Sequence, residues 1–341
     1  MAGKITVAHR LVLFFFLVSV SSTCWGWGAK GHRVVGQIAE TQLTETSKSI
    51  LNRLLDGDTL ASVSNWPDYI KSYAAGRGYG NWHYTSVDDG LVYSDASAVG
   101  LAGVKIKEMI GVLSGSKPRP QGFTNRMVVA WLVHLVGDIH NPLHAGRVGD
   151  RGGNDIIVSY FGELKNLHQV WDSSMIENDG LSFTELAKKI NTLQRKSKLD
   201  LGHEDPNKWV NESIQLRPYV YDLVEGTLKE IGGAPAPLKP ESAFHSMQLS
   251  RLGSPSKGRL PFDRIEKIDM RKCSTYAGWD DSDTARSARR QEPGFCKQIP
   301  RLGYSYSARN MKVVENRLLQ AGIRLGKVLN QALSSSKGKL K

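Results

Sequence analysis

The sequence predicts a mainly α-helical fold, because most of its apolar patterns have helical spacing and only one short stretch resembles a strand. Apolar residues recur every three or four positions in several stretches, the longest near residues 123–135 and 311–333. One β-like run, Ile156 to Phe161, precedes a glycine suited to a hairpin turn. We therefore expect an all-α protein with a small β-hairpin and a long loop-rich insertion near the C-terminus.

The first helices can be placed from the residues that begin and end them. The sequence after Trp27 opens one helix, and a second is expected from about Thr46 to a stop at Gly57. Thr124 is the expected N-cap of a central helix. Pro142 ends or kinks that helix, since proline cannot continue its hydrogen bonding.

The C-terminal half combines further helices with the insertion. Residues from Phe183 to about Glu230 are expected to be helical, and a last helix is expected from Met311 to about Leu333. Between them, the stretch from about 235 to 303 is rich in Pro, Ser, Gly and Arg and has little periodicity. We expect residues 27–341 to form a single domain that carries this insertion.

The first 26 residues have the pattern of a secretory signal peptide. Lys4 and Arg10 precede an apolar run from Leu11 to Val20, which is too short to span a bilayer stably. Cleavage would give a secreted or periplasmic protein without stable membrane association, whereas an uncleaved segment would be a signal anchor. In such a compartment we expect Cys273 and Cys296 to form a disulfide bond, the alternative being two unpaired thiols.

Composition indicates a globular protein with a basic surface. The 341 residues are 40% hydrophobic and 23% charged, and the formal net charge is +12. A strongly basic protein favours polyanionic partners, either nucleic acid or an anionic membrane surface. The charge alone cannot separate the two, and solubility is a third explanation.

Histidine and aspartate pairs are concentrated in the middle of the chain. On a helix, His134 and Asp138 lie four residues apart and face the same way, and His144 follows just beyond the proline. His168 and Asp172 repeat the pairing. A single histidine on an apolar helix is more often a hydrogen-bonded core residue. Two such pairs in one chain instead predict metal binding.

Other stretches add further imidazoles and carboxylates. The candidate donors are His32, Asp68, His83, His134, Asp138, His144, His168 and Asp172. They are too many for one tetrahedral zinc ion, so several metal ions are implied. Mixed imidazole and carboxylate ligands suit zinc, and paired metals can stabilise the attacking and leaving oxygens in phosphoester hydrolysis.

In this order the motifs resemble the zinc-dependent, single-strand-specific nucleases of the fungal S1/P1 type. The matching elements are Trp27 to His32, Trp66-Pro-Asp68, Trp82-His83-Tyr84, His134 to His144, Gly152-Gly-Asn154 and Asn166 to Asp172. The resemblance implies a mainly helical, phospholipase C/nuclease-like fold that holds three zinc ions.

The resemblance also implies the ligands of each ion. The first would be bound by Asp68, His83, His134 and Asp138, the second by His144, His168 and Asp172, and the third by His32, Asp138 and the backbone of Trp27. The free α-amino group of Trp27 exists only after cleavage, so removal of the signal would complete the site.

Four residues have further roles by this resemblance. Asp68 would orient the attacking water, and Lys71 stands where the family uses an arginine to stabilise negative charge. Asn154 would donate to a phosphate oxygen. Tyr84 either stacks on an unpaired base or packs in the core.

The implied protein is a secreted, monomeric endonuclease. It would hydrolyse single-stranded DNA and RNA to 5′-phosphorylated products and would also act on 3′-nucleotides. The nearest alternative is a zinc-dependent phospholipase C, which resembles this family in fold and metal set. A second alternative is a non-catalytic protein that binds metal or nucleic acid.

Overall fold

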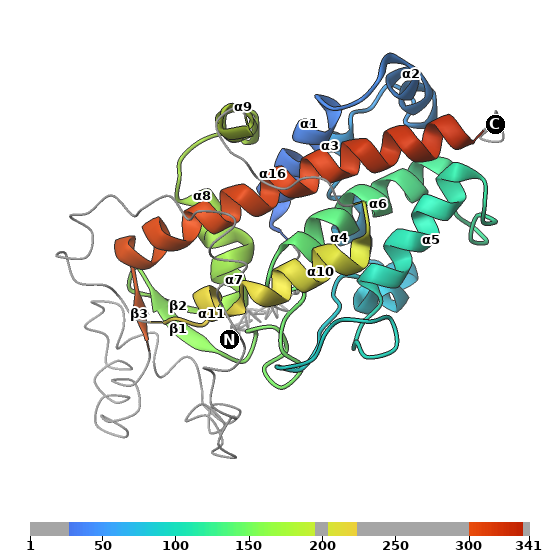
Figure 1. Ribbon diagram of the computed structural model, residues 1–341. Helices are drawn as coiled ribbons and strands as arrows, with labels where there is room; N and C mark the ends of the chain where they lie inside the picture. Colours follow the sequence, from blue (N-terminus) through green and yellow to red (C-terminus); the bar gives the residue numbers. More distant parts are fainter. Residues whose placement is uncertain (1–26, 195–203, 224–299, 337–341) are drawn as a thin grey trace, which may run out of the picture.

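The computed structural model describes residues 27–194, 204–223 and 300–336 (Figure 1). In these ranges the chain is mostly helical, with a small sheet beside the start of the last helix. The mainly helical fold predicted from the sequence is therefore confirmed.

Helix α6 (Asn125–His140) lies at the centre of the fold. Its N-cap is Thr124, whose side chain accepts a hydrogen bond from the backbone N–H of Met127, as predicted. Every residue of α6 from Val128 to His140 is buried, so the helix is enclosed by its neighbours on all sides. It ends where Asn141 becomes extended, directly before Pro142.

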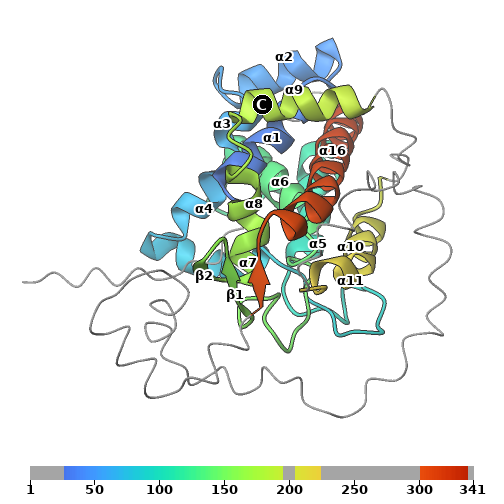
Figure 2. The same ribbon diagram turned by 90° about the vertical axis from the view of Figure 1, so that its left-hand side faces the viewer.

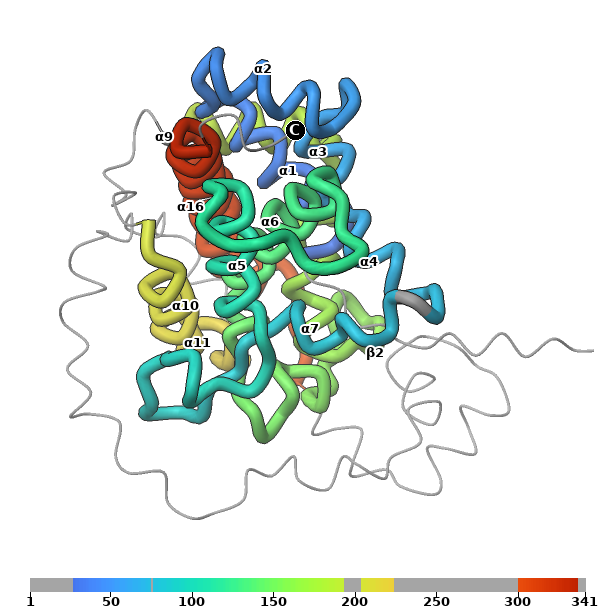
Figure 3. Tube along the Cα trace, turned by 90° about the vertical axis from the view of Figure 1, so that its right-hand side faces the viewer, coloured from blue at the N-terminus to red at the C-terminus, as the bar shows by residue number. Residues whose placement is uncertain are grey.

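Two long helices cross beside α6. Helix α1 (Ala29–Glu40) packs against α16 (Tyr304–Ser335), where Gly322 lets the backbones approach. A Cβ atom at Gly322 would lie 2.5 Å from the Cβ of Ile38. Helix α5 (Ala102–Ser114) packs on α6 from another side. Figure 3 shows α6 between α16 and α4.

Helix α16 begins at Tyr304, seven residues before the predicted start at Met311. Its first turns bury only Tyr306 and Asn310, so they carry too few apolar residues to show a helical period. Tyr306 is fixed by hydrogen bonds instead, accepting from Trp171 and donating to the backbone carbonyl of Val220.

The shorter helices surround this centre. They are α2 (Glu45–Leu54), α3 (Leu60–Val63), α4 (Trp66–Ile70), the 3₁₀ helix η1 (Ala74–Trp82), α9 (Phe183–Gln194), α10 (Pro206–Gln215) and α11 (Arg217–Val220). Helix α2 begins one residue before the predicted start, and Gly57 follows it with a φ of 79°. Figure 2 shows α2 and α9 on the opposite side of the molecule from the sheet.

The predicted hairpin is present, and a third strand joins it. Strands β1 (Ile157–Tyr160) and β2 (Glu163–Asn166) pair antiparallel. Phe161 and Gly162 both have positive φ, which suits a tight hairpin turn. Strand β3 (Arg301–Leu302) pairs parallel with β1, giving the order β2-β1-β3. Strand β3 lies in the stretch expected to be loop-rich. With two residues, it is too short to show the alternation of polar and apolar residues that predicts a strand.

After the hairpin, one helical segment carries the second His–Asp pair. It consists of α7 (Leu167–Gln169), the π-helical turn η2 (Val170–Ser174) and α8 (Met175–Glu177). The sequence predicted a regular helix here, so the π turn is a correction. A π turn widens the helix by one residue and is often found at functional sites.

Several predicted features lie outside the described residues: the signal peptide, Cys273, Cys296 and most of the insertion. Among the helices that the structure describes, none is long and apolar enough to cross a membrane.

Candidate metal centre

Among the described residues, three groups of buried His and Asp side chains could each hold a metal ion. They are His32, His134 and Asp138; Asp68, His83 and His134; and His144, His168 and Asp172. Within each group the potential ligand atoms lie within 4.8 Å of one another. All eight side-chain donors singled out in the sequence are therefore brought together.

The Asp68–His83–His134 group is assembled from three separate elements. Helix α4 supplies Asp68, His83 follows η1, and α6 supplies His134. The Nε2 atom of His134 lies 3.6 Å from Oδ1 of Asp68 and 3.3 Å from Oδ2 of Asp138. The Nδ1 atom of His83 lies 3.3 Å from the same Asp138 oxygen and 2.9 Å from Nε2 of His134.

These separations fit a shared cation. Zinc holds nitrogen and oxygen ligands at about 2.0–2.2 Å, so two ligands of a tetrahedron lie about 3.3–3.6 Å apart. The contacts of Asp138 and Asp68 with the imidazoles match that spacing, which is longer than a hydrogen bond.

The group that contains His32 depends on a glycine of α6. The His32 ring stacks on His134 with centroids 3.8 Å apart, and its Nε2 lies 3.4 Å from Oδ1 of Asp138. A Cβ atom at Gly137 would lie only 2.8 Å from Nδ1 of His32, so a larger residue would displace the imidazole. Trp27 is fully buried beside the same glycine.

The His144 group combines the turn after α6 with the segment after the hairpin. The Nε2 atom of His168 lies 3.0 Å from Oδ2 of Asp172, and Nε2 of His144 lies 3.5 Å from Oδ1. The N–H of Gly28 donates to the backbone carbonyl of Asp172 at 2.7 Å. This bond joins the N-terminal segment that carries Trp27 to the π turn.

Backbone carbonyls orient three of the imidazoles. The Nδ1 atoms of His134, His144 and His168 contact the carbonyl oxygens of Ser64, His83 and Gly152 at 2.8, 2.5 and 2.7 Å. Each Nδ1–H donates to its carbonyl, so in the neutral imidazole the lone pair of Nε2 points into the group. Metal-binding histidines are typically held in this way.

The centre also gathers buried polar atoms that have no hydrogen-bond partner. They include both ring nitrogens of His32, Oδ2 of Asp68, both carboxylate oxygens of Asp138, Nε2 of His83 and Nε2 of His144. Leaving such an atom unpaired costs about 1–3 kcal/mol, and more for a charged one. Cations between these atoms would compensate for the cost, so the residues present fit bound metal ions.

The pKa shifts of the buried His and Asp side chains also favour metal binding. Burial lowers the pKa of His134 to about 3 against the opposing charge of Asp138, so the imidazole is neutral as a ligand must be. Burial would raise the pKa of Asp138, but His134 and His144 hold it well below its usual value. Burial would lower the pKa of His144, but Asp138 and Asp172 raise it to about 9. Two buried carboxylates around one imidazole create a site that attracts cations.

Lys71 lies beside Asp68. Its Nζ contacts Oδ1 of Asp68 at 2.6 Å, and its side chain is 13% exposed against 1% for Asp68. Burial would raise the pKa of Asp68, but electrostatic interactions with His134 and Lys71 lower it. The pair therefore places an ionised carboxylate inside the group and a cation at its outer edge.

Asn154 and Tyr84 lie near the centre but belong to none of the three groups. Both are half-buried. The side-chain amide of Asn154 donates to the carbonyl of Arg151 at 2.8 Å, within the glycine-rich loop that also holds His168. The ring of Tyr84 packs on Gly100, where a Cβ atom would lie 2.6 Å from its Cδ2.

Asn141 is a further residue of the site whose role was not predicted from the sequence. Its buried amide donates to Oδ1 of Asp172 at 2.5 Å, and its side-chain oxygen accepts from the N–H of Leu143 at 3.0 Å. It thus connects the turn before His144 to the carboxylate of the same group. Its place directly before a proline at a helix end was the available signal.

His140 points away from the three groups. Its Nδ1 contacts the carbonyl of Val136 at 2.7 Å, and its Nε2 lies 3.1 Å from Nη1 of Arg324. Burial and the charges of Arg317 and Arg324 lower its pKa far below the usual value. Its role is therefore structural.

Comparison with known proteins places the chain among nucleases. The chain matches the S1/P1 Nuclease family over residues 27–231. Endonuclease 4 of Arabidopsis thaliana is 28% identical over 326 residues, which are 91% of this chain and 90% of that protein. Nuclease S1 of Aspergillus oryzae is 32% identical over 170 residues, 47% of this chain and 58% of that protein. Nuclease P1 of Penicillium citrinum is 28% identical over 159 residues, which are 44% of this chain and 58% of that protein. The chain therefore belongs to the S1/P1 nuclease family, which indicates a metal-dependent hydrolase of phosphodiester bonds.

Proposed function

We propose that the protein is a zinc-dependent endonuclease that cleaves single-stranded DNA and RNA to 5′-phosphorylated products and also hydrolyses 3′-nucleotides. The observation that supports it most is the convergence of three buried His and Asp groups, in which both ring nitrogens of His32 and both carboxylate oxygens of Asp138 lack a hydrogen-bond partner. Membership of the nuclease family gives the reaction class, and the net charge of +12 suits a polyanionic substrate.

Three zinc ions would be held by nine residues. The first set is Asp68, His83, His134 and Asp138; the second is His144, His168 and Asp172; the third is His32, Asp138 and the backbone of Trp27. When bound, the ions supply an activated water and take up charge from the phosphate oxygens.

The residues around the ions would then position the reacting groups. Asp68, buried and ionised, orients the attacking water and accepts its proton. Lys71, at the outer edge of the group, neutralises the charge that develops on the phosphate. Asn154 donates to a phosphate oxygen, and the ring of Tyr84 stacks on the base.

Cleavage of the signal peptide would complete the third metal site. Cleavage after Gly26 frees the α-amino group of Trp27, and the enzyme works outside the cell or in the periplasm, with Cys273 and Cys296 paired. N-terminal sequencing of active enzyme tests the cleavage site. Activity in protein that begins at another residue would contradict the role of Trp27.

A digestion experiment tests the function itself. Mature protein is incubated with single-stranded DNA, duplex DNA and RNA, with and without a chelator and added zinc. We expect cleavage of single strands that the chelator abolishes and zinc restores. Hydrolysis of phosphatidylcholine but not of nucleic acid would indicate a phospholipase C, and bound zinc without any phosphodiesterase activity would indicate a non-catalytic protein.

A further inference from the structure

The segment between Asp68 and His83 starts and ends beside residues of the metal centre. Residues 69–80, called the 69–80 loop, comprise the last two residues of α4, a short turn and most of η1. They begin directly after Asp68 and end three residues before His83. Asp68 and His83 belong to the same group of candidate ligands. The loop therefore extends from the edge of that group to the surface.

The 69–80 loop exposes two aromatic rings. Tyr69 is 48% exposed and Tyr73 is 68% exposed. Cβ atoms at Gly78 and Gly80 would meet nothing within 4 Å, so the backbone there is open to an approaching ligand. Packing does not require glycine at these two positions, unlike at Gly76, where a Cβ atom would lie 1.8 Å from the carbonyl oxygen of Ile70.

A third tyrosine attaches the loop to the core. The ring of Tyr79 lies 4.7 Å from that of Trp82 and 5.6 Å from that of Trp131, in edge-on contacts. This packing holds the end of the loop. The rings of Tyr69 and Tyr73 remain largely exposed and are available to a partner.

The charge of the loop is entirely positive. It carries Lys71 and Arg77, and no Asp or Glu occurs from Tyr69 to Val87. Arg77 is exposed and forms no ion pair within the part of the chain that the structure describes.

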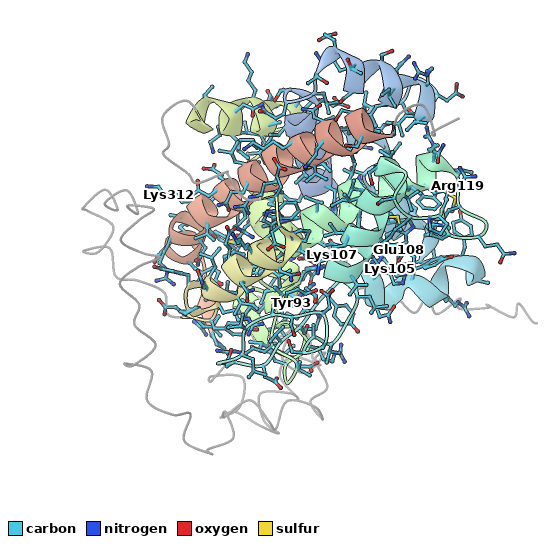
Figure 4. The ribbon with its side chains drawn as sticks, turned by 45° about the vertical axis from the view of Figure 1, so that its right-hand side comes forward. Tyr93, Lys105, Lys107, Glu108, Arg119 and Lys312 are labelled. Atoms are coloured by element: carbon cyan, nitrogen blue, oxygen red, sulfur yellow. The ribbon has the colours of Figure 1, made fainter. Side chains whose placement is uncertain are left out.

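The lysines of α5 (Figure 4) provide a contrast to the loop. Lys105 pairs with Glu108 at 2.7 Å, and Lys107 pairs with Asp95 at 2.7 Å. Their positive charge is thus largely neutralised by neighbouring carboxylates. In the 69–80 loop, Lys71 pairs with Asp68, whereas the exposed Arg77 keeps its positive charge for an external anion.

We propose that the 69–80 loop binds the nucleic acid strand beyond the reacting nucleotide. Tyr69 and Tyr73 stack on unpaired bases, and Arg77 contacts the phosphate backbone. Exposed aromatic rings interleaved with cations and glycines suit a single strand, because its bases are free to stack whereas those of a duplex are already stacked. This inference rests on the proposed nuclease function and adds a substrate-binding surface to it.

Kinetics on substrates of different length test the loop. For the double variant Tyr69→Ala/Tyr73→Ala, we expect KM for a single-stranded decanucleotide to rise about tenfold. The value of kcat, KM for a dinucleotide and the metal content should stay unchanged. Tyr304→Ala is the matched control, since Tyr304 is 81% exposed at the start of α16 and belongs to none of the metal groups. Its kinetics should equal those of the wild type.

Two further measurements separate stacking from loss of structure. Tyr69→Phe/Tyr73→Phe keeps both rings and should retain the wild-type KM. In chelator-treated protein, binding of a fluorescent single strand should weaken in Tyr69→Ala/Tyr73→Ala. Arg77→Ala should reduce the slope of the logarithm of the binding constant against the logarithm of the salt concentration by about one. An unchanged KM and binding constant in the Ala variant would overturn the loop proposal and leave the nuclease intact. Absence of cleavage by the wild type would overturn the proposed function, while the binding assay would still test the loop.

Discussion

Asp138 shows how one side chain of the metal centre serves two groups. Its Oδ1 lies 3.4 Å from Nε2 of His32 and 3.6 Å from Nδ1 of His144, and its Oδ2 lies 3.3 Å from ring nitrogens of both His83 and His134. The two oxygens point to different imidazoles, as expected of a carboxylate that bridges two metal ions.

Asp138→Asn is expected to lower the zinc content by more than one ion per chain, because an amide nitrogen cannot act as the second ligand oxygen. Asp172→Asn is the comparison, since Asp172 contributes to the His144 group alone and should lower the content by one ion. Elemental analysis after dialysis measures both. Equal losses in the two variants would argue against a bridging Asp138.

Asn141→Ala is expected to weaken zinc binding at the His144 group by about 10–100-fold, because the carboxylate of Asp172 loses the amide that orients it. The control is Ser213→Ala, which removes a buried hydrogen bond to the carbonyl of Ile139 at the same end of α6 but touches no candidate ligand. Competition with a chromogenic chelator measures the affinity. A similar loss in both variants would mean that Asn141 acts only through stability.

Zinc binding at the His144 group should depend on pH. With a pKa of about 9, metal-free His144 carries a proton that zinc must displace, so affinity should rise about tenfold per pH unit between pH 6.5 and 8.5. Without metal, the raised pKa stabilises the fold fully below pH 6.5, and that stability is lost as pH rises towards 9. Calorimetric titrations at three pH values check this. An affinity that does not change with pH would contradict the protonated state of His144.

At the scale of elements, α16 and α10 together fix the end of α6. Arg317 of α16 donates to the carbonyl of His140 at 3.0 Å and to Glu212 of α10 at 2.8 Å. Arg324 also donates to Glu212, at 2.6 and 2.8 Å. The two buried guanidinium groups depend on one carboxylate for their charge balance. Because His140 precedes Asn141, this contact supports the turn that carries His144.

Glu212→Gln is therefore expected to destabilise the protein by about 3–5 kcal/mol at pH 7, since it leaves two buried cations without a counter-charge. Burial would raise the pKa of Glu212, but hydrogen bonds and charge from the arginines lower it below its usual 4.5. That stability is present above pH 4.5 and is lost as pH falls through the lowered pKa. Urea unfolding at pH 7 and at lower pH should show the difference between wild type and variant shrinking in acid.

Local signals explain which elements the sequence predicts well. Helix α6 was predicted because Thr124 caps it and its apolar residues are continuous. The start of α16, strand β3 and the π turn at Asp172 were not predicted, because each depends on tertiary partners. The start of α16 is held by side-chain hydrogen bonds of Tyr306, and β3 by pairing with β1.

At the scale of the whole molecule, the metal centre joins segments that are far apart in the sequence. Helices α1, α4 and α6, the residue after η1 and the segment after the hairpin all contribute candidate ligands. The eight candidate donors could be singled out from the sequence because they lie in short motifs. Asn141 and Arg317 could not, since their roles depend on contacts 31 and 177 residues away along the chain.

A zinc titration of chelator-stripped mature protein tests the central claim most directly. Zinc is added in steps while bound metal, melting temperature and cleavage of single-stranded DNA are recorded together. We expect cleavage to return only as three zinc ions bind per chain, and the melting temperature to rise with them because metal binding stabilises the folded state. Full cleavage by metal-free protein, or saturation without any gain in cleavage, would contradict the account.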